Sequence, residues 1–178
     1  MENLSNTQKL SRKFNNNVRR LEAETFIQAP NLKEIIFNSN LLEFVHEDAF
    51  KKLTKLQQLG LDGNFIESLS INIFDDLESL KIVYLAENRI EDLPGGLFRN
   101  NLKLEQIILQ KNKIKTISSN LFTNLKSLTN VDLRYNLCIH LDFGIEGEMI
   151  PFSKMYDEIN KCKNANTLEN MNKFCKAT

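Results

Sequence analysis

The sequence predicts an α/β solenoid, in which each turn of the chain adds one short strand to a parallel sheet. Three observations predict this fold. An asparagine recurs every 24 residues, a phenylalanine recurs with the same period, and aliphatic columns keep a fixed distance from both. One short strand cannot bury its apolar face alone, so stacked copies are needed to make a continuous core.

Paired aliphatic columns predict one strand in every unit. In Leu59-Gly60-Leu61, two aliphatic residues flank a small one, which is the alternation of a strand that buries a single face. The same inward pair recurs every 24 residues: Ile35 and Phe37, Leu59 and Leu61, Val83 and Leu85, Ile107 and Leu109, Val131 and Leu133. We therefore expect parallel strands that stack with these pairs pointing inward.

The asparagine column predicts a ladder of hydrogen bonds inside the turn that follows each strand. An Asn side chain offers both a carbonyl acceptor and an NH₂ donor, so it can satisfy backbone groups there. After Asn16, the structural ladder comprises Asn40, Asn64, Asn88, Asn112 and Asn136. The phenylalanine column is expected to fill the convex side, where the chain packs back on the sheet; it comprises Phe26, Phe50, Phe74, Phe98 and Phe122.

The stretch from Leu80 to Phe98 reads LKIVYLAENRIEDLPGGLF. It resembles the leucine-rich-repeat family in its 24-residue "typical" class, and the resemblance extends over roughly residues 16–140. It implies a right-handed, curved leucine-rich-repeat solenoid with the parallel sheet on the concave side. It also associates the chain with secreted proteins and receptor ectodomains.

Departures from the repeat suggest three parts: an N-terminal segment or degenerate cap at 1–15, repeats at 16–136, and a cysteine-bearing cap at 137–178. Gln8, Ser11 and Lys13 occupy positions that should be apolar, so residues 1–15 form a polar cap or the chain is truncated relative to a longer parent. The last leucine of one unit is replaced by Asn101, where we expect Leu102 to substitute.

The C-terminal cap is predicted to contain short helices. Apolar residues spaced for one helix could close the open end of the core; they are Ile150, Phe152, Met155, Tyr156 and Ile159. A capping box at 166–169 predicts a second helix.

Three cysteines lie in this cap. The run around Cys138 resembles the start of the family's C-terminal cysteine cap, although His140 stands where that cap has a further cysteine. We expect a disulfide between Cys138 and Cys162, because the first follows the last strand and the second ends the expected helix. Cys175 is then a free thiol, an intermolecular bridge in a homo-oligomer, or a residue with a lost partner. Three reduced cysteines in a cytosolic protein are the alternative.

Catalytic chemistry is not expected. His46 and His140 are several repeats apart, and Cys138 with His140 lacks two further metal ligands nearby. We therefore expect no enzyme, no cofactor and no metal. Lys+Arg and Asp+Glu balance at 23 each, which gives no electrostatic case for nucleic acid. No apolar run approaches the roughly 20 residues of a membrane span.

Binding is expected on the outward columns of the sheet, whose residues the core does not determine. Ile82, Tyr84 and Ile108 should be neighbours there and form an apolar patch, with a shallow notch at Gly60. The predicted protein-binding residues on the concave face are Glu34, Ile36, Gln58, Ile82, Tyr84, Gln106, Ile108, Asp132 and Arg134. The alternative reading is that these residues only stiffen the sheet through cross-strand packing.

We therefore expect an extracellular or secreted module for adhesion, receptor or immune-type recognition of a protein partner. The alternative is a cytosolic scaffold or regulatory subunit, which the polar first residues favour because they lack the apolar core of a secretory signal.

Overall fold

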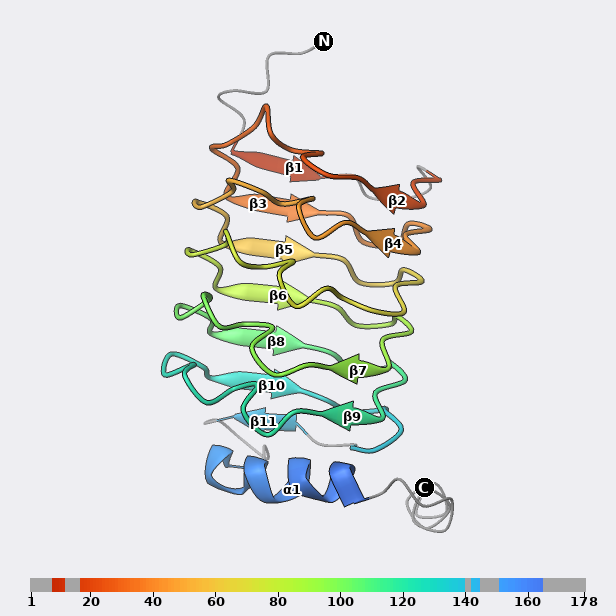
Figure 1. Cartoon of the computed structure of the whole chain (residues 1–178), viewed down its shortest axis with the longest axis vertical. Helices are drawn as coiled ribbons and strands as arrows, with labels where there is room; N and C mark the ends of the chain where they lie inside the picture. The colour runs from red at the N-terminus through yellow and green to blue at the C-terminus, as the bar shows by residue number, and fades with distance from the viewer. Residues whose placement is uncertain (1–7, 12–16, 140–141, 145–150, 165–178) are drawn as a thin grey trace.

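The chain forms one coil of stacked turns (Figure 1). The computed structural model describes residues 8–11, 17–139, 142–144 and 151–164. A seven-stranded sheet runs along the coil in the order β1-β3-β5-β6-β8-β10-β11. Its strands are β1 (Lys9–Ser11), β3 (Glu34–Ile36), β5 (Gln58–Gly60), β6 (Ile82–Tyr84), β8 (Gln106–Ile108), β10 (Asn130–Asp132) and β11 (Asp142–Gly144).

The five strands expected from the aliphatic columns are confirmed. From β3 to β10, each strand pairs in parallel with the next at a spacing of 24 residues, so that Leu59 lies opposite Ile35 and Val83. The inward residues of these strands are fully buried, and the apolar residues two positions further along are fully or nearly fully buried. The predicted parallel-sheet solenoid is therefore the observed fold.

The N-terminal strand β1 departs from the 24-residue period. Leu10 lies opposite Ile35, a spacing of 25 residues (35 − 10), and it packs half-buried against the core. The expectation that Ser11 would occupy the inward position is therefore wrong. A one-residue shift in register exchanges the two faces of a strand, and here it brings an apolar side chain inward.

Four short strands form a second layer of pairing on the other side of the coil. They are β2 (Arg20–Leu21), β4 (Phe44–Val45), β7 (Asp92–Leu93) and β9 (Thr116–Ile117), paired as β2-β4 and β7-β9. The phenylalanine column is buried between the two sides. Phe26 stacks on Phe50 with ring centroids 5.8 Å apart, and Phe74 stacks on Phe98 at 5.5 Å. Each of these two stacked pairs thus joins a unit to its neighbour.

The asparagine side chains join successive turns. Asn64 Nδ2 donates to the carbonyl of Leu61 in its own unit at 2.8 Å and to that of Phe37 in the preceding unit at 3.1 Å. Its Oδ1 accepts from Leu42 N at 3.0 Å. The same three bonds recur at Asn88, Asn112 and Asn136. All of these side chains are buried, so the backbone groups in the turns are satisfied without water.

Asn101 takes the leucine position itself, and the expected substitution by Leu102 is wrong. Asn101 is fully buried, whereas Leu102 is 55% exposed. The amide is tolerated because its Nδ2 donates to Phe74 O at 2.8 Å and Leu77 O at 3.0 Å. Its Oδ1 has no hydrogen-bond partner among the described residues.

The C-terminal end is closed by β11 and by helix α1 (Phe152–Asn164), which lies across the end of the coil (Figure 1). Strand β11 pairs antiparallel with β10 and covers the sheet edge. Met155 and Ile159 on α1 are buried in the core. The first predicted cap helix is therefore confirmed. The second predicted helix, His140, Cys175 and the side chain of Cys162 lie outside the described residues.

Candidate functional site on the sheet face

The outward side of the sheet presents three residues from each of five units, two on the strand and one just after it. We call this surface the concave face. It comprises residues 34, 36 and 38 and their counterparts in the next four units, which are 58, 60 and 62, then 82, 84 and 86, then 106, 108 and 110, and then 130, 132 and 134. Register places Tyr84 beside Ile108, and Ile82 beside Gln106. The sheet therefore brings together side chains that lie a whole unit apart in the sequence.

The centre of the concave face is apolar. Ile82, Tyr84 and Ile108 lie on the adjacent strands β6 and β8, and each keeps part of its surface exposed to solvent. Gln58 and Gln106 flank them and are also half-buried. We call the first three residues the apolar patch. An aromatic residue within a small apolar area surrounded by polar groups is the usual composition of a protein-binding hot spot.

The N-terminal half of the concave face contains a hollow of about 490 Å³. Gly60 lies beneath it, since a Cβ on this residue would come within 2.6 Å of Asn38 Oδ1 and 2.9 Å of Ile36 Cδ1. These two side chains lean over the glycine, and Ile36 is consequently only 7% exposed. The lining residues of this Gly60 hollow are Lys9, Glu34, Ile36, Asn38, Gln58, Asp62 and Tyr84.

Two carboxylates line this hollow, and Asp62 is the one that forms no ion pair with a basic side chain among the described residues. Its Oδ1 accepts from Ala86 N at 2.8 Å, and its Oδ2 accepts from Asn38 Nδ2 at 3.1 Å. The pKa of Asp62 is raised to about 6, mainly by burial and to a smaller extent by the negative charge of Glu87, while the two hydrogen bonds oppose this rise. Removal from water therefore outweighs the hydrogen bonds. Glu34, by contrast, is paired with Lys9 at 2.7 Å.

The C-terminal end of the concave face is closed by an ion pair. Asp132 is only 3% exposed and accepts from Arg134 Nε at 2.9 Å and Nη2 at 2.6 Å. Two of the predicted binding residues, Ile36 and Asp132, are therefore buried. Ile36 is covered because it folds over Gly60, and Asp132 because Arg134 and the edge strand β11 surround it. Arg134 remains exposed.

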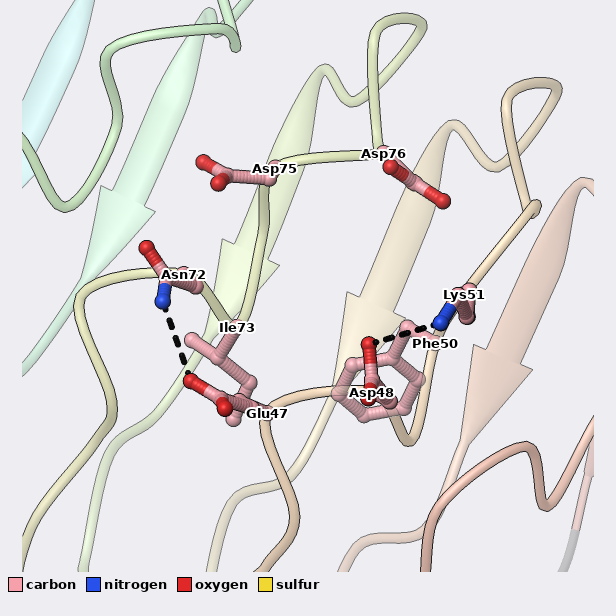
Figure 2. A pocket seen from close by; sticks show the side chains of 8 residues that line it. All are labelled: Glu47, Asp48, Phe50, Lys51, Asn72, Ile73, Asp75 and Asp76. Atoms are coloured by element: carbon pink, nitrogen blue, oxygen red, sulfur yellow. Dashed lines mark hydrogen bonds and ion pairs between the residues drawn. The ribbon is translucent and has the colours of Figure 1, made fainter.

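A second cavity, of about 370 Å³, lies away from the sheet (Figure 2). It separates residues 47–51 of one unit from residues 72–76 of the next. Glu47 Oε2 accepts from Asn72 Nδ2 at 3.0 Å and Ser70 Oγ at 2.9 Å, and these bonds lower the pKa of Glu47. On the same side as Glu47, Asp48 pairs with Lys51 at 3.4 Å.

In the next unit along, a side chain of this chain occupies the corresponding position. The Arg99 guanidinium donates to Ile71 O at 3.1 Å and to Asn72 Oδ1 at 2.8 Å, and it pairs with the Asp75 carboxylate. Asp75 lines the second cavity but is therefore already engaged. Sequence reasoning missed this cavity, whose only signal is the acidic residues near 47 and 75, about one unit apart.

His46 has a structural environment. Its Nδ1 accepts from Asp48 N at 3.0 Å, and its ring meets the edge of Phe44. Within the described ranges, no group of three His, Cys, Asp or Glu side chains is arranged to hold a metal ion.

A sequence profile described as leucine rich repeat matches residues 13–66 and 78–137 of the chain. A comparison with curated protein sequences gives no match. Several solved structures are similar. A TLR13–ssRNA13 complex matches at 29% identity with a TM-score of 0.62, over 65% of this chain and 16% of that one. The leucine-rich-repeat domain of APL1 matches at 26% identity with a TM-score of 0.65, over 67% of this chain and 32% of that one.

The LRIM1/APL1C complex is also similar, at 26% identity and a TM-score of 0.67, over 70% of this chain and 23% of that one. The chain thus spans less than a third of the length of each of these three relatives. Helix α1 is too short and too polar to cross a membrane, and the described ranges hold no other helix.

Proposed function

The chain belongs to the leucine-rich-repeat family, and we propose that it recognises a protein partner through its concave face. The observation that carries the proposal is the apolar patch of Ile82, Tyr84 and Ile108. Register places these side chains on adjacent strands, and their outward orientation serves no need of the core. A partner that covers these side chains would bury apolar surface, and the neighbouring hollow could accept one of its side chains.

The charges of the concave face favour a protein over a nucleic acid. One of the similar structures is a complex with single-stranded RNA, which requires basic side chains to neutralise phosphates. Arg134 on this face and Lys9 at its N-terminal edge are each paired with a carboxylate, and the Asp62 carboxylate is paired with no basic side chain. A phosphate backbone would thus meet no free cation there. Another similar structure is the LRIM1/APL1C complex, in which leucine-rich-repeat proteins are assembled.

We place the protein outside the cell. We propose that Cys138 is disulfide-bonded and that Cys162 is its partner. Disulfides persist in oxidising compartments and are rare in the cytosol. Intact mass spectrometry of the native protein should therefore give a mass that rises on reduction by one pair of hydrogens for each disulfide. A mass unchanged by reduction would favour the cytosolic scaffold instead.

Paired variants test the binding face. The change is Tyr84→Ala with Ile108→Ala, and the matched control is Ile71→Ala with Leu102→Ala, which removes exposed apolar side chains that are not on the sheet. The partner is captured with the wild-type chain from the extracellular fluid and, separately, from the cell extract of the native source. The captured partner should bind the wild-type chain and the control variant with equal affinity. The concave variant should bind it about 30-fold more weakly, the effect of losing about 2 kcal/mol. Equal binding by both variants would reject the concave face.

A further inference from the structure

We propose that the Gly60 hollow is a subsite for a basic side chain, arginine or lysine, presented by the protein partner. This inference rests on the proposed function and narrows it, because it names the chemistry that the N-terminal half of the concave face selects. Four observations carry it: the shape of the hollow, its balance of charge, its unused hydrogen-bonding groups and the aromatic wall beside it.

The shape comes from Gly60. With no side chain at this position, Ile36 and Asn38 fold over the strand instead of projecting from it, and the surface falls away between β3 and β6. Tyr84 lies opposite Gly60 on the next strand and forms one wall of the hollow. A side chain entering here would therefore meet the buried aliphatic surface of Ile36 and the side of an aromatic ring.

The charge of the hollow is negative. Three charged residues line it, and Lys9 and Glu34 neutralise each other at 2.7 Å. Asp62 is left with only neutral donors, Ala86 N and Asn38 Nδ2. A carboxylate that is partly removed from water gains more from an added cation than an exposed one does, because the local screening is weaker.

Two polar side chains of the hollow are unused. Neither the Gln58 amide nor the Tyr84 hydroxyl makes a hydrogen bond with another of the described residues, so both can serve a ligand. A guanidinium has five N–H donors in one plane and stacks on aromatic faces, and an ammonium also binds over a tyrosine ring. The Arg20 guanidinium already lies over the Phe44 ring at 4.1 Å elsewhere on this chain. Asp62, Gln58 and Tyr84 together thus match a basic side chain better than an acidic or a purely apolar one.

The test uses three capped tripeptides that differ in charge at one position. They are acetyl-Ala-Arg-Ala-amide, its citrulline counterpart, which is neutral and nearly the same shape, and its glutamate counterpart. Each is titrated into the isotope-labelled full chain while the backbone amide resonances of Gly60, Asp62 and Tyr84 are followed by NMR. The arginine peptide should shift these three resonances, with a dissociation constant about tenfold lower than that of the citrulline peptide.

Variants assign the effect to the hollow. Asp62→Asn should weaken the arginine peptide about fivefold, since it removes the charge while keeping the shape. Tyr84→Leu should also weaken it by removing the aromatic wall. Glu91→Gln is the matched control, because it deletes one negative charge from an exposed pair with Lys115 away from the sheet, and it should leave binding unchanged. The amide spectrum of each variant verifies that it is folded.

Several results would overturn the subsite: no shift with the arginine peptide, equal affinity for the citrulline peptide, or tighter binding of the glutamate peptide. Shifts produced more strongly by uridine monophosphate would also overturn it and favour a nucleic acid. The outcome is separable from that of the proposed function. If the Tyr84 and Ile108 variants lose partner binding but no peptide binds in the hollow, only the subsite is rejected. If the arginine peptide binds in the hollow but the Tyr84 and Ile108 variants keep their affinity for the partner, only the wider concave interface is rejected.

Discussion

Inward and outward positions of the sheet differ in how closely they repeat. Leu59 and Leu61 have apolar counterparts in every unit from β3 to β10, and these are all fully or nearly fully buried. The outward position between them is Gly60 here, but Ile36, Tyr84, Ile108 and Asp132 in the other units. Stacking determines the first set, because each inward side chain must fit its neighbours above and below. The second set is free to vary, and its variation creates a hollow, an apolar patch and a closed ion pair along one face.

The largest expected effects lie at the inward side of this comparison. Asn88→Ala should lower the free energy of unfolding by about 3 kcal/mol, because it leaves the amide of Ile66 and the carbonyls of Leu61 and Leu85 with fewer buried partners. Thermal and urea denaturation measure the change. A loss no greater than that of an exposed substitution would show that the ladder does not hold the turns together.

A second inward asparagine should behave in the opposite way. Asn101→Leu should raise the free energy of unfolding by about 1–2 kcal/mol, because it removes the unpaired Oδ1 and adds buried apolar surface. The two carbonyls that Asn101 contacts stay bonded, since Phe74 O also accepts from Leu77 N and Leu77 O from Leu80 N. Urea denaturation compares this variant with Asn88→Ala. The comparison distinguishes an asparagine that stabilises the turns from one that merely occupies a leucine position. A destabilised Asn101→Leu variant would contradict this distinction.

Asp62 offers a pH-dependent test on the outward side. Its pKa in the folded chain, about 6, lies above its ordinary value of 3.8, so the folded state holds its proton more tightly than the unfolded state does. Its contribution to stability is therefore full below pH 3.8 and is lost as pH rises through 6. Asp62→Asn should be more stable than wild type by about 1 kcal/mol at pH 7.5, since the carboxylate keeps partial solvent contact.

This gain should nearly disappear near pH 3.5, where Asp62 is largely protonated in both states. Urea denaturation at the two pH values measures it, and Glu91→Gln serves as the control because Glu91 is exposed and paired with Lys115. A difference between Asp62→Asn and wild type that does not change with pH would contradict the assignment of the raised pKa to burial.

The smallest expected change in stability is at the apolar patch. Ile108→Ala should lower the free energy of unfolding by less than about 1 kcal/mol, because the side chain is only half-buried and contributes mainly cross-strand packing with Tyr84. Thermal denaturation compares it with Ile107→Ala, the adjacent inward residue, which is fully buried and should cost about 2–5 kcal/mol. Similar losses at the two positions would mean that the patch serves the fold.

The sequence was sufficient to predict those parts of the fold that repeat. The strand positions, their parallel order and the first cap helix all follow from regular spacing of apolar side chains. The two ends were harder, because each has only one neighbour and need not obey the period. At the N-terminus a single additional residue between Leu10 and Leu21 shifts the register and turns Leu10 inward. At the C-terminus β11 pairs antiparallel with β10, and nothing in its three residues signals this pairing.

The concave face could be predicted only as a set of outward positions. Which of them stay open depends on contacts between side chains of neighbouring units, such as Ile36 folding over Gly60 and Asp132 binding Arg134. Such contacts have no signature in spacing. The Gly60 hollow was foreseen only as a shallow notch, since its depth depends on how far Ile36 and Asn38 move into the space that a Cβ would fill.

Photo-cross-linking of the isolated complex tests the central claim most directly, that the partner contacts the face of the sheet. A photoreactive phenylalanine analogue is placed at position 84 in one sample and at position 102, which is exposed in the turn before β8 and is not part of the concave face, in another. Irradiation should join the partner to the chain labelled at position 84 and leave the chain labelled at position 102 unjoined. Cross-links from position 102 without any from position 84 would contradict the concave face as the site of recognition.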